Sequence, residues 1–144
     1  MTKITRQTVL QKMGLISRLA WEYARENMDT DGLSSVQQKV CIAIYNDPGL
    51  SQDAVAQELG MDKSSIAKLV AKLMAGSYIR RETNPEDRRE YKLYLDERGA
   101  KCTDELVKNL NFFMDKFISP VDSGIMERMN AVLDTVLENY TAEL

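Results

Sequence analysis

The chain has 144 residues and a net charge of −3, and 44% of its residues are hydrophobic and 28% charged. This composition is typical of a soluble globular protein, and the length fits one domain that buries about two-thirds of its unfolded surface. The longest apolar run, 40–45, is far too short for a membrane span of roughly 20 residues, and the N-terminus lacks the pattern of a secretory signal. We therefore expect a cytoplasmic protein without a membrane partner.

The cysteines and the absence of histidine narrow the chemistry further. Cys41 lies inside the apolar run and shares no spacing pattern with Cys102, so we expect two reduced thiols, with a redox switch as the alternative. Without histidine, most zinc sites and proton-relay catalysts are excluded. No nucleophile-base pair, metal-ligand cluster or glycine-rich phosphate loop is visible. We expect no catalytic residue, no metal and no cofactor, and hence no enzyme.

The charge is unevenly distributed along the chain. Residues 63–92 contain eight basic and four acidic side chains, a local charge of +4, whereas the remainder contains 11 basic and 18 acidic ones, or −7. Such asymmetry turns one surface of a protein toward phosphates and the others away from them. An acidic chain with a basic segment is therefore compatible with a nucleic-acid partner.

The first predicted helix covers about 5–27, and apolar residues recur on one stripe at spacings of three and four. Further apolar residues widen this stripe beyond what a single neighbour covers, which indicates packing against several elements, including a second subunit; core packing alone is the alternative. A second helix starts after Ser34, where Gln37 completes a capping box, and it ends at the turn sequence 46–49.

Two short helices follow. Ser51 is expected to cap the first, which ends at Gly60, and Asp62 to cap the second. The core face of the second contains Ile66, Leu69, Val70 and Leu73, and its opposite face contains Ser64, Ser65, Lys68, Ala71 and Lys72. Small hydroxyls and lysines on an exposed helical face suit the DNA major groove, and a solvated face is the alternative.

Two short helices joined by a glycine-containing turn have the length of a helix-turn-helix. Residues 78–82 and 91–95 then read as two strands, with a basic loop between them that forms a wing. The predicted fold is mainly α with a small β-wing (α+β), namely a winged helix-turn-helix domain with a helical dimerisation region built from both termini.

Two further helices end the chain. One runs from about Asp96 to Ile118, where Ser119-Pro120 breaks it, and the last is capped by Asp122 or Ser123. These helices and the first one have more apolar surface than a small domain covers, which favours a homodimer. The predicted interface residues are Val9, Met13, Leu110, Phe113, Phe117, Ile125, Val132 and Val136. The predicted domains are 1–32 (dimerisation helix), 33–96 (DNA-binding domain) and 97–144 (dimerisation helices).

On these residues the sequence resembles the MarR family of winged-helix transcriptional regulators over nearly the whole chain. The most specific similarity is 79–89, with the wing signature Asp87-Arg88-Arg89, followed by 93–99. Supporting similarities are 50–60 for the helix that braces the reader and 62–65 for the start of the recognition helix. In one departure, Ser77 follows the recognition helix where the family commonly has glycine, and Gly76 lies one position earlier, so we expect the exit turn to differ by a residue.

The resemblance implies that Arg89 or Arg88 enters the minor groove and that Asp87 holds the wing by pairing with an arginine, which we take to be Arg81. Arginine reads the negative potential of a narrow minor groove well. The candidate DNA-contacting residues are Ser51, Lys63, Ser64, Ser65, Lys68, Lys72, Arg88 and Arg89.

The resemblance also implies regulation by a small aromatic or phenolic effector, for which Trp21, Tyr23 and Tyr45 are candidate lining residues; plain core packing is the alternative. Peroxide sensing by an early reactive cysteine and zinc sensing by histidines are disfavoured, because this chain lacks those residues. The expected function is that of a ligand-responsive repressor that binds a pseudo-palindromic operator in double-stranded DNA as a homodimer. The alternative is a winged-helix protein-interaction module without specific DNA binding.

Overall fold

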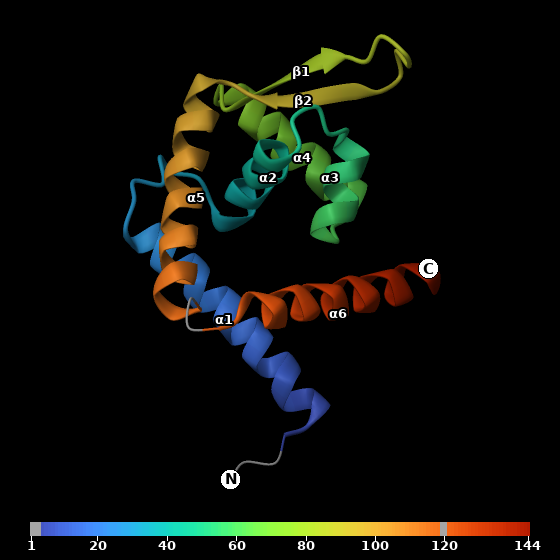
Figure 1. Cartoon of the computed structure of the whole chain (residues 1–144). Helices are drawn as coiled ribbons and strands as arrows, with labels where there is room; N and C mark the ends of the chain where they lie inside the picture. Colours follow the sequence, from blue (N-terminus) through green and yellow to red (C-terminus); the bar gives the residue numbers. More distant parts are fainter. Residues whose placement is uncertain (1–3, 119–120) are drawn as a thin grey trace. The chain divides into compact units, whose positions relative to one another are not determined.

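The computed structural model describes residues 4–118 and 121–144. In chain order its elements are α1 (Arg6–Glu26), α2 (Ser35–Asn46), α3 (Gln52–Leu59), α4 (Lys63–Ala75), β1 (Ile79–Thr83), β2 (Tyr91–Leu95), α5 (Glu97–Phe117) and α6 (Ser123–Ala142) (Figure 1). The chain forms two compact units, of which the first ends at Asn111 and the second begins at Phe112, within α5. The predicted fold class, mainly helical with a two-stranded wing, is confirmed.

Side-chain caps fix where the helices begin. Ser34 and Gln37 form the expected capping box on α2, Ser51 accepts a hydrogen bond from the Ala54 amide on α3, and Asp62 accepts one from the Ser65 amide on α4. Gly60 ends α3 in the left-handed region at φ 62°, which costs glycine little because it has no Cβ. These caps place α3 and α4 only a few residues apart.

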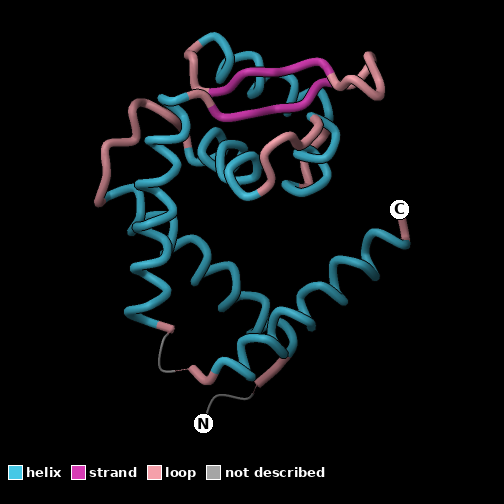
Figure 2. The backbone as a smooth tube through the Cα atoms, turned by 45° about the horizontal axis from the view of Figure 1, so that its top comes forward, coloured by secondary structure: helices cyan, strands magenta, loops and turns pink. Residues whose placement is uncertain are grey.

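The core of the first unit lies between α2, α3, α4 and the hairpin. It consists of Leu33, Val40, Cys41, Ile44, Val55, Ala56, Ile66, Val70, Leu73, Tyr78, Ile79 and Leu93. Strands β1 and β2 pair antiparallel, with Ile79 opposite Leu95 and Thr83 opposite Tyr91, and the wing loop extends beyond their paired ends (Figure 2). Strand β1 starts one residue later than expected, because the Tyr78 amide donates to the Leu73 carbonyl oxygen and so belongs to the exit turn of α4.

The second unit contains the end of α5 and all of α6. Asp122 caps α6, and its carboxylate accepts hydrogen bonds from the Gly124 and Ile125 amides. The predicted break at Ser119-Pro120 lies outside the described residues. None of the residues of α6 is buried, and most of its apolar side chains are exposed among the residues that the structure describes.

Both cysteines are free thiols, with Cys41 buried and Cys102 partly buried. Burial raises the pKa of the Cys41 thiol to about 12, because the thiolate is poorly solvated there. Within residues 4–118 and 121–144, no helix is long and apolar enough to cross a membrane, and no three acidic or cysteine side chains are grouped as metal ligands.

Candidate nucleic-acid interface

The recognition helix α4 has one buried face and one open face, as the sequence predicts. Ile66, Val70 and Leu73 are buried, whereas Lys63, Ser64, Lys68, Ala71 and Lys72 are exposed and Ser65 and Leu69 are half-buried. The buried face fixes the rotation of the helix about its axis. The lysines are therefore held on the solvent side, where their ammonium groups lie within reach of a ligand.

The first turn of α4 contains a compact hydrogen-bond group around Asp62. The Ser64 hydroxyl donates to Asp62 Oδ2 at 2.6 Å, and the Ser65 hydroxyl donates to Asp62 Oδ1 at 2.7 Å. The Ser65 amide also donates to Asp62 Oδ2 at 2.9 Å. These bonds, the one from the Ser64 hydroxyl first, hold the pKa of the Asp62 carboxyl well below its usual range. Asp62 is therefore ionised at neutral pH.

Two polar residues at the start of α3, Ser51 and Asp53, belong to the same candidate surface as α4. Lys63 pairs with Asp53 at 3.2 Å, and both side chains are exposed, so this ion pair adds little stability and separates readily. The Ser51 hydroxyl oxygen accepts from the Ala54 amide at 3.1 Å, which leaves its own hydrogen available as a donor. An open pocket of about 510 Å³ joins Ser51 to the wing, and its lining residues are Ser51, Gln52, Asp53, Arg81, Asp87, Arg89, Glu90 and Tyr91.

Asn84 organises the wing loop, a role that the sequence analysis missed. Its side chain is buried, its amide nitrogen Nδ2 donates to Glu90 Oε2 at 3.2 Å, and its Oδ1 accepts from the Glu86 amide at 3.0 Å. The backbone amide of Asn84 also donates to the Glu90 carbonyl oxygen. The Asn-Pro dipeptide was a signal for this turn, but the pairing with Glu90 needs the fold.

The ion pair expected between Asp87 and Arg81 does not form among the described residues. Asp87 Oδ1 instead accepts from the Arg89 amide at 3.0 Å, and the Asp87 carbonyl oxygen accepts from the Glu90 amide. Arg81 lies over the Tyr91 ring, with its guanidinium carbon 4.4 Å from the ring centre. The carboxylate thus shapes the turn through backbone bonds, and the guanidinium gains a cation-π contact across the two strands.

Arg88 and Arg89 are exposed at the tip of the wing, and neither guanidinium has a partner in the part of the chain that the structure describes. The two arginines are thus held by a turn that Asn84 and Asp87 stabilise and by the pairing of β1 with β2. This arrangement presents charge to a ligand at little cost in reorganisation.

The turn after α4 is not shifted by one residue, although the position of Gly76 led us to expect such a shift. Ser77 itself adopts the left-handed region at φ 63°, so it occupies the position where glycine is expected. Gly76 has an ordinary φ of −82°, and it is small for another reason, because a Cβ there would lie 2.7 Å from the Tyr78 ring. Gly99 in α5 likewise lacks a Cβ that would meet the Tyr78 carbonyl oxygen at 2.1 Å.

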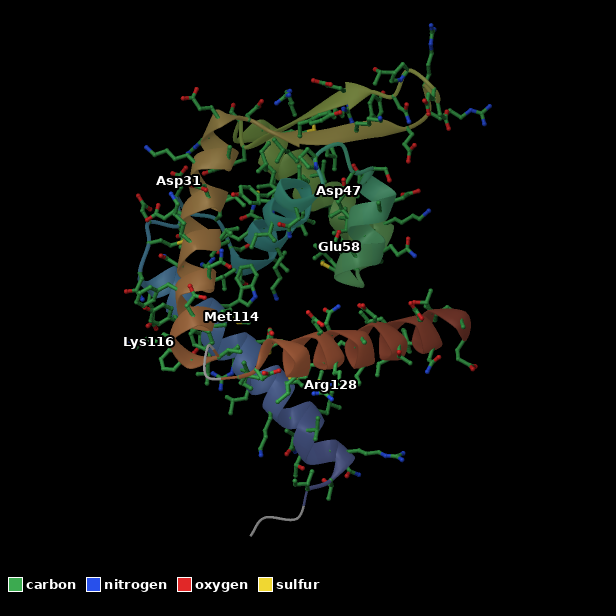
Figure 3. The ribbon with its side chains drawn as sticks, viewed as in Figure 1. Asp31, Asp47, Glu58, Met114, Lys116 and Arg128 are labelled. Atoms are coloured by element: carbon green, nitrogen blue, oxygen red, sulfur yellow. The ribbon has the colours of Figure 1, made fainter. Side chains whose placement is uncertain are left out.

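A second feature that the sequence did not reveal is a clamp formed by Asp31, Tyr78 and Arg98. Arg98 donates from Nε and Nη2 to the two carboxylate oxygens of Asp31, and from Nη1 to the Gly76 carbonyl oxygen at 2.7 Å. The guanidinium lies over the Tyr78 ring, and the Tyr78 hydroxyl donates to Asp31. Asp31, labelled in Figure 3, lies beside α5 in the loop before α2. The clamp ties this loop and α5 to the exit of α4.

The predicted interface residues remain largely uncovered within the single chain. Val9 and Met13 on α1, Phe117 on α5, and Ile125, Val132 and Val136 on α6 are exposed, and Leu110 and Phe113 are half-buried. The Phe113 and Phe117 rings contact each other at a centroid distance of 4.9 Å. Exposed apolar residues in such number on helices indicate an interaction surface.

The candidate effector residues all lie in the first unit. Trp21 is half-buried beneath Lys39, whose Nζ lies 5.2 Å from the ring centre. Tyr45 is 37% exposed, and its hydroxyl donates to Asp104 Oδ1 at 3.3 Å. Tyr23 is half-buried. None of the three is fully buried core.

Comparison with known proteins supports this description. A model of the MarR family matches residues 42–90. A candidate regulatory protein for the hcr operon of Thauera aromatica is 38% identical over 81 residues, 56% of this chain and 49% of that protein, so the match spans about half the length of that relative.

Solved structures with the same fold align over nearly the whole chain. A MarR transcriptional regulator from Methanosarcina mazei Go1 has a TM-score of 0.74 at 22% identity and covers 96% of this chain and 100% of its own. CouR from Rhodococcus jostii RHA1 has a TM-score of 0.78 at 18% identity, covering 94% and 96%. The structural similarity establishes the fold, and the match to the family model covers the segment from α2 to the wing. The segment 42–90 thus resembles the MarR family of transcriptional regulators, and the chain as a whole has the fold of solved MarR structures.

Proposed function

We propose that the protein binds a specific pseudo-palindromic operator in double-stranded DNA as a homodimer and represses transcription until a small effector releases it. One observation carries the DNA-binding part. The exposed face of α4 presents Lys63, Lys68 and Lys72, and the wing presents Arg88 and Arg89 without partners among the described residues. These five cations belong to one compact unit with a rigid core.

The polarity of these groups fits the two grooves of DNA. A helix with serines in its first turn and lysines further along suits the major groove, where serines approach base edges and lysines reach guanine or phosphate. Adjacent arginines on a narrow loop suit the minor groove. The Ser51 hydroxyl, which keeps a free hydrogen at the start of α3, suits a phosphate oxygen.

The homodimer rests on the exposed apolar side chains of α1 and α6. Helix α6 contains Ile125, Met129, Val132, Val136 and Tyr140 at spacings of three and four, all of them exposed. An isolated helix of this kind gains little from propensity alone and needs a covered face. A two-fold dimer would bury this face and would place two recognition helices on half-sites about one helical turn apart.

The effector proposal is supported by two structurally similar proteins and by the accessibility of three aromatic side chains. CouR is known in a form bound to p-coumaroyl-CoA, and PcaV from Streptomyces coelicolor in complex with its natural ligand. In this chain Trp21, Tyr23 and Tyr45 are reachable aromatic side chains. Compounds that bind the folded state raise Tm, so a thermal-shift screen of aromatic acids with no stabilising compound would count against this part alone.

Selection of bound duplexes from a random pool at physiological salt tests the DNA-binding function. We expect an enriched palindromic sequence, bound by two copies of the chain. Lack of enrichment, with weak and salt-sensitive binding to every duplex, would favour the protein-interaction module, in which the basic surface contacts an acidic partner. A reporter promoter that overlaps the selected duplex then tests repression, which activation by the protein would contradict.

A further inference from the structure

The hydrogen bonds in the first turn of α4 fix the direction in which its two serine hydroxyls point their hydrogens. Both hydroxyls that face the expected DNA surface are already bonded to one carboxylate, Ser64 to Oδ2 and Ser65 to Oδ1 of Asp62. An ionised carboxylate has no proton to donate, so each serine must donate its single hydroxyl hydrogen to Asp62. The outward lone pairs of the two hydroxyl oxygens are then acceptors only.

The carboxylate is held in place by the backbone as well. Asp62 Oδ2 accepts from the Ser65 amide at 2.9 Å, and Asp62 is the N-cap of a 13-residue helix. Hydrogen bonds to an ionised acceptor are stronger than those between neutral groups. A base oxygen would therefore have to compete with a stronger acceptor for each serine hydrogen. The lowered pKa of Asp62 keeps the carboxylate ionised throughout the neutral range.

The major groove offers two kinds of partner to such a helix. Cytosine N4 and adenine N6 present amino donors, whereas guanine O6 and thymine O4 present acceptors. A hydroxyl oxygen that can only accept a hydrogen bond pairs well with a base amino group. Facing a base carbonyl oxygen, it is repelled, because the lone pairs of the two oxygens point at each other. The lysines further along α4 have the opposite preference, because an ammonium group can only donate.

We propose that Asp62 is a specificity-determining residue, which holds the hydrogens of Ser64 and Ser65 so that the first turn of α4 accepts hydrogen bonds from cytosine or adenine amino groups and disfavours guanine and thymine. The inference rests on the proposed DNA binding. It assigns the preference to a residue that itself touches no base, since both oxygens of Asp62 are occupied by its own helix.

The test replaces Asp62 by asparagine in the full chain. Asparagine is as good an N-cap as aspartate, but its side chain has one acceptor oxygen instead of two, and its amide donates. At least one serine hydroxyl then turns its hydrogen outward. Asp53→Asn is the matched control, because it removes the same charge from an exposed carboxylate beside Lys63 without touching a serine.

Duplex selection with the wild type and both variants, at one salt concentration, gives the base frequencies at each operator position. For wild type we expect cytosine or adenine at one or two positions of each half-site. Asp62→Asn should lower that preference by about tenfold and admit guanine or thymine there. Asp53→Asn should keep the wild-type preference, while both variants bind all duplexes more tightly because a negative charge is lost.

A second variant separates the polarity of the hydroxyls from any change in the helix. Ser64→Ala with Ser65→Ala should lose the preference for cytosine or adenine without gaining guanine or thymine, because no donor is created. Identical base frequencies for wild type and Asp62→Asn would overturn the inference and leave DNA binding intact. No enriched duplex for wild type would overturn the proposed function, and the inference with it.

Discussion

Arg98 and Asp31, 67 residues apart in sequence, meet in a two-pronged ion pair in which Arg98 Nε lies 2.7 Å from Asp31 Oδ2 and Nη2 lies 3.1 Å from Oδ1. This pair, then the Tyr78 hydroxyl, lowers the pKa of the Asp31 carboxyl. Because the folded-state pKa lies below the unfolded one, the stabilisation is present above about pH 4 and is lost as the pH falls through the lowered value.

We therefore expect Arg98→Met to lower Tm by about 2–4 °C near neutral pH. The difference from wild type should stay constant from about pH 8 to pH 5 and shrink below about pH 4, as the pH falls from the unfolded-state pKa toward the lowered pKa of folded Asp31. Thermal melts followed by circular dichroism across this range check it. Arg18→Met is the control, because it removes an exposed pair with Glu22 within one helix and should change Tm less. Equal shifts for both variants would show that the clamp ties nothing together.

Ser77→Gly should stabilise the fold by about 0.5–1 kcal/mol, because the relief of the strain of a left-handed serine at φ 63° outweighs the conformational freedom that glycine adds to the unfolded chain. Gly76→Ala should have the opposite sign, with a cost of about 1–3 kcal/mol, since its Cβ would lie 2.7 Å from the buried Tyr78 ring. Urea unfolding measures both. Destabilisation by Ser77→Gly would mean that the serine side chain has a stabilising role in this turn.

Arg89→Ala should weaken binding to every duplex by a similar factor and reduce the salt slope of log K by about one, because one phosphate-region contact is lost. Lys68→Ala should instead change which duplexes are preferred. Arg128→Ala is the control for net charge, since Arg128 lies on α6 (Figure 3) and donates to the Gly124 carbonyl oxygen. Titration of the selected duplex at several salt concentrations checks these outcomes, and unchanged binding by Arg89→Ala contradicts the wing assignment.

Val132→Glu should dissociate the proposed homodimer at least about tenfold more readily, because it places a charge in an apolar surface that the dimer would bury. Val132 is 62% exposed in the single chain, so the substitution has little reason to unfold a monomer. Sedimentation velocity over a range of concentrations measures the effect, with Thr135→Glu on the same helix as the control. A wild-type chain that sediments as a monomer at all concentrations would end the dimer proposal.

Local chemistry made much of this fold predictable. The caps at Ser34, Ser51 and Asp62 and the left-handed Gly60 depend on neighbours within a few residues. The rotation of α4 followed from its apolar spacing, because only one face of that helix has large aliphatic side chains. The positions of the open lysines followed from the same spacing.

Contacts distant in sequence were not predictable. Arg98 and Asp31 carry no periodic signal. The ion pair expected for Asp87 is not formed, because Asp87 Oδ1 and the Asp87 carbonyl oxygen accept backbone hydrogen bonds in the turn and Arg81 lies over the Tyr91 ring. In the turn after α4, the presence of Gly76 suggested that the left-handed residue would be Gly76, whereas it is Ser77. Gly76 is needed because a Cβ there would meet the Tyr78 ring, and not because of its φ. The predicted site and interface residues remain predictions, because their ligands are DNA, an effector and a second copy of the chain.

The wing tip has a practical consequence for handling the protein. Trypsin cleaves after arginine where the backbone is exposed and irregular, and Arg88-Arg89 fulfils both conditions, whereas Arg80 and Arg81 lie in a paired strand. We therefore expect trypsin to cut the free protein at the wing tip, beside the two guanidiniums that are proposed to enter DNA. Bound DNA would shield them, so the rate of nicking reports occupancy without any label.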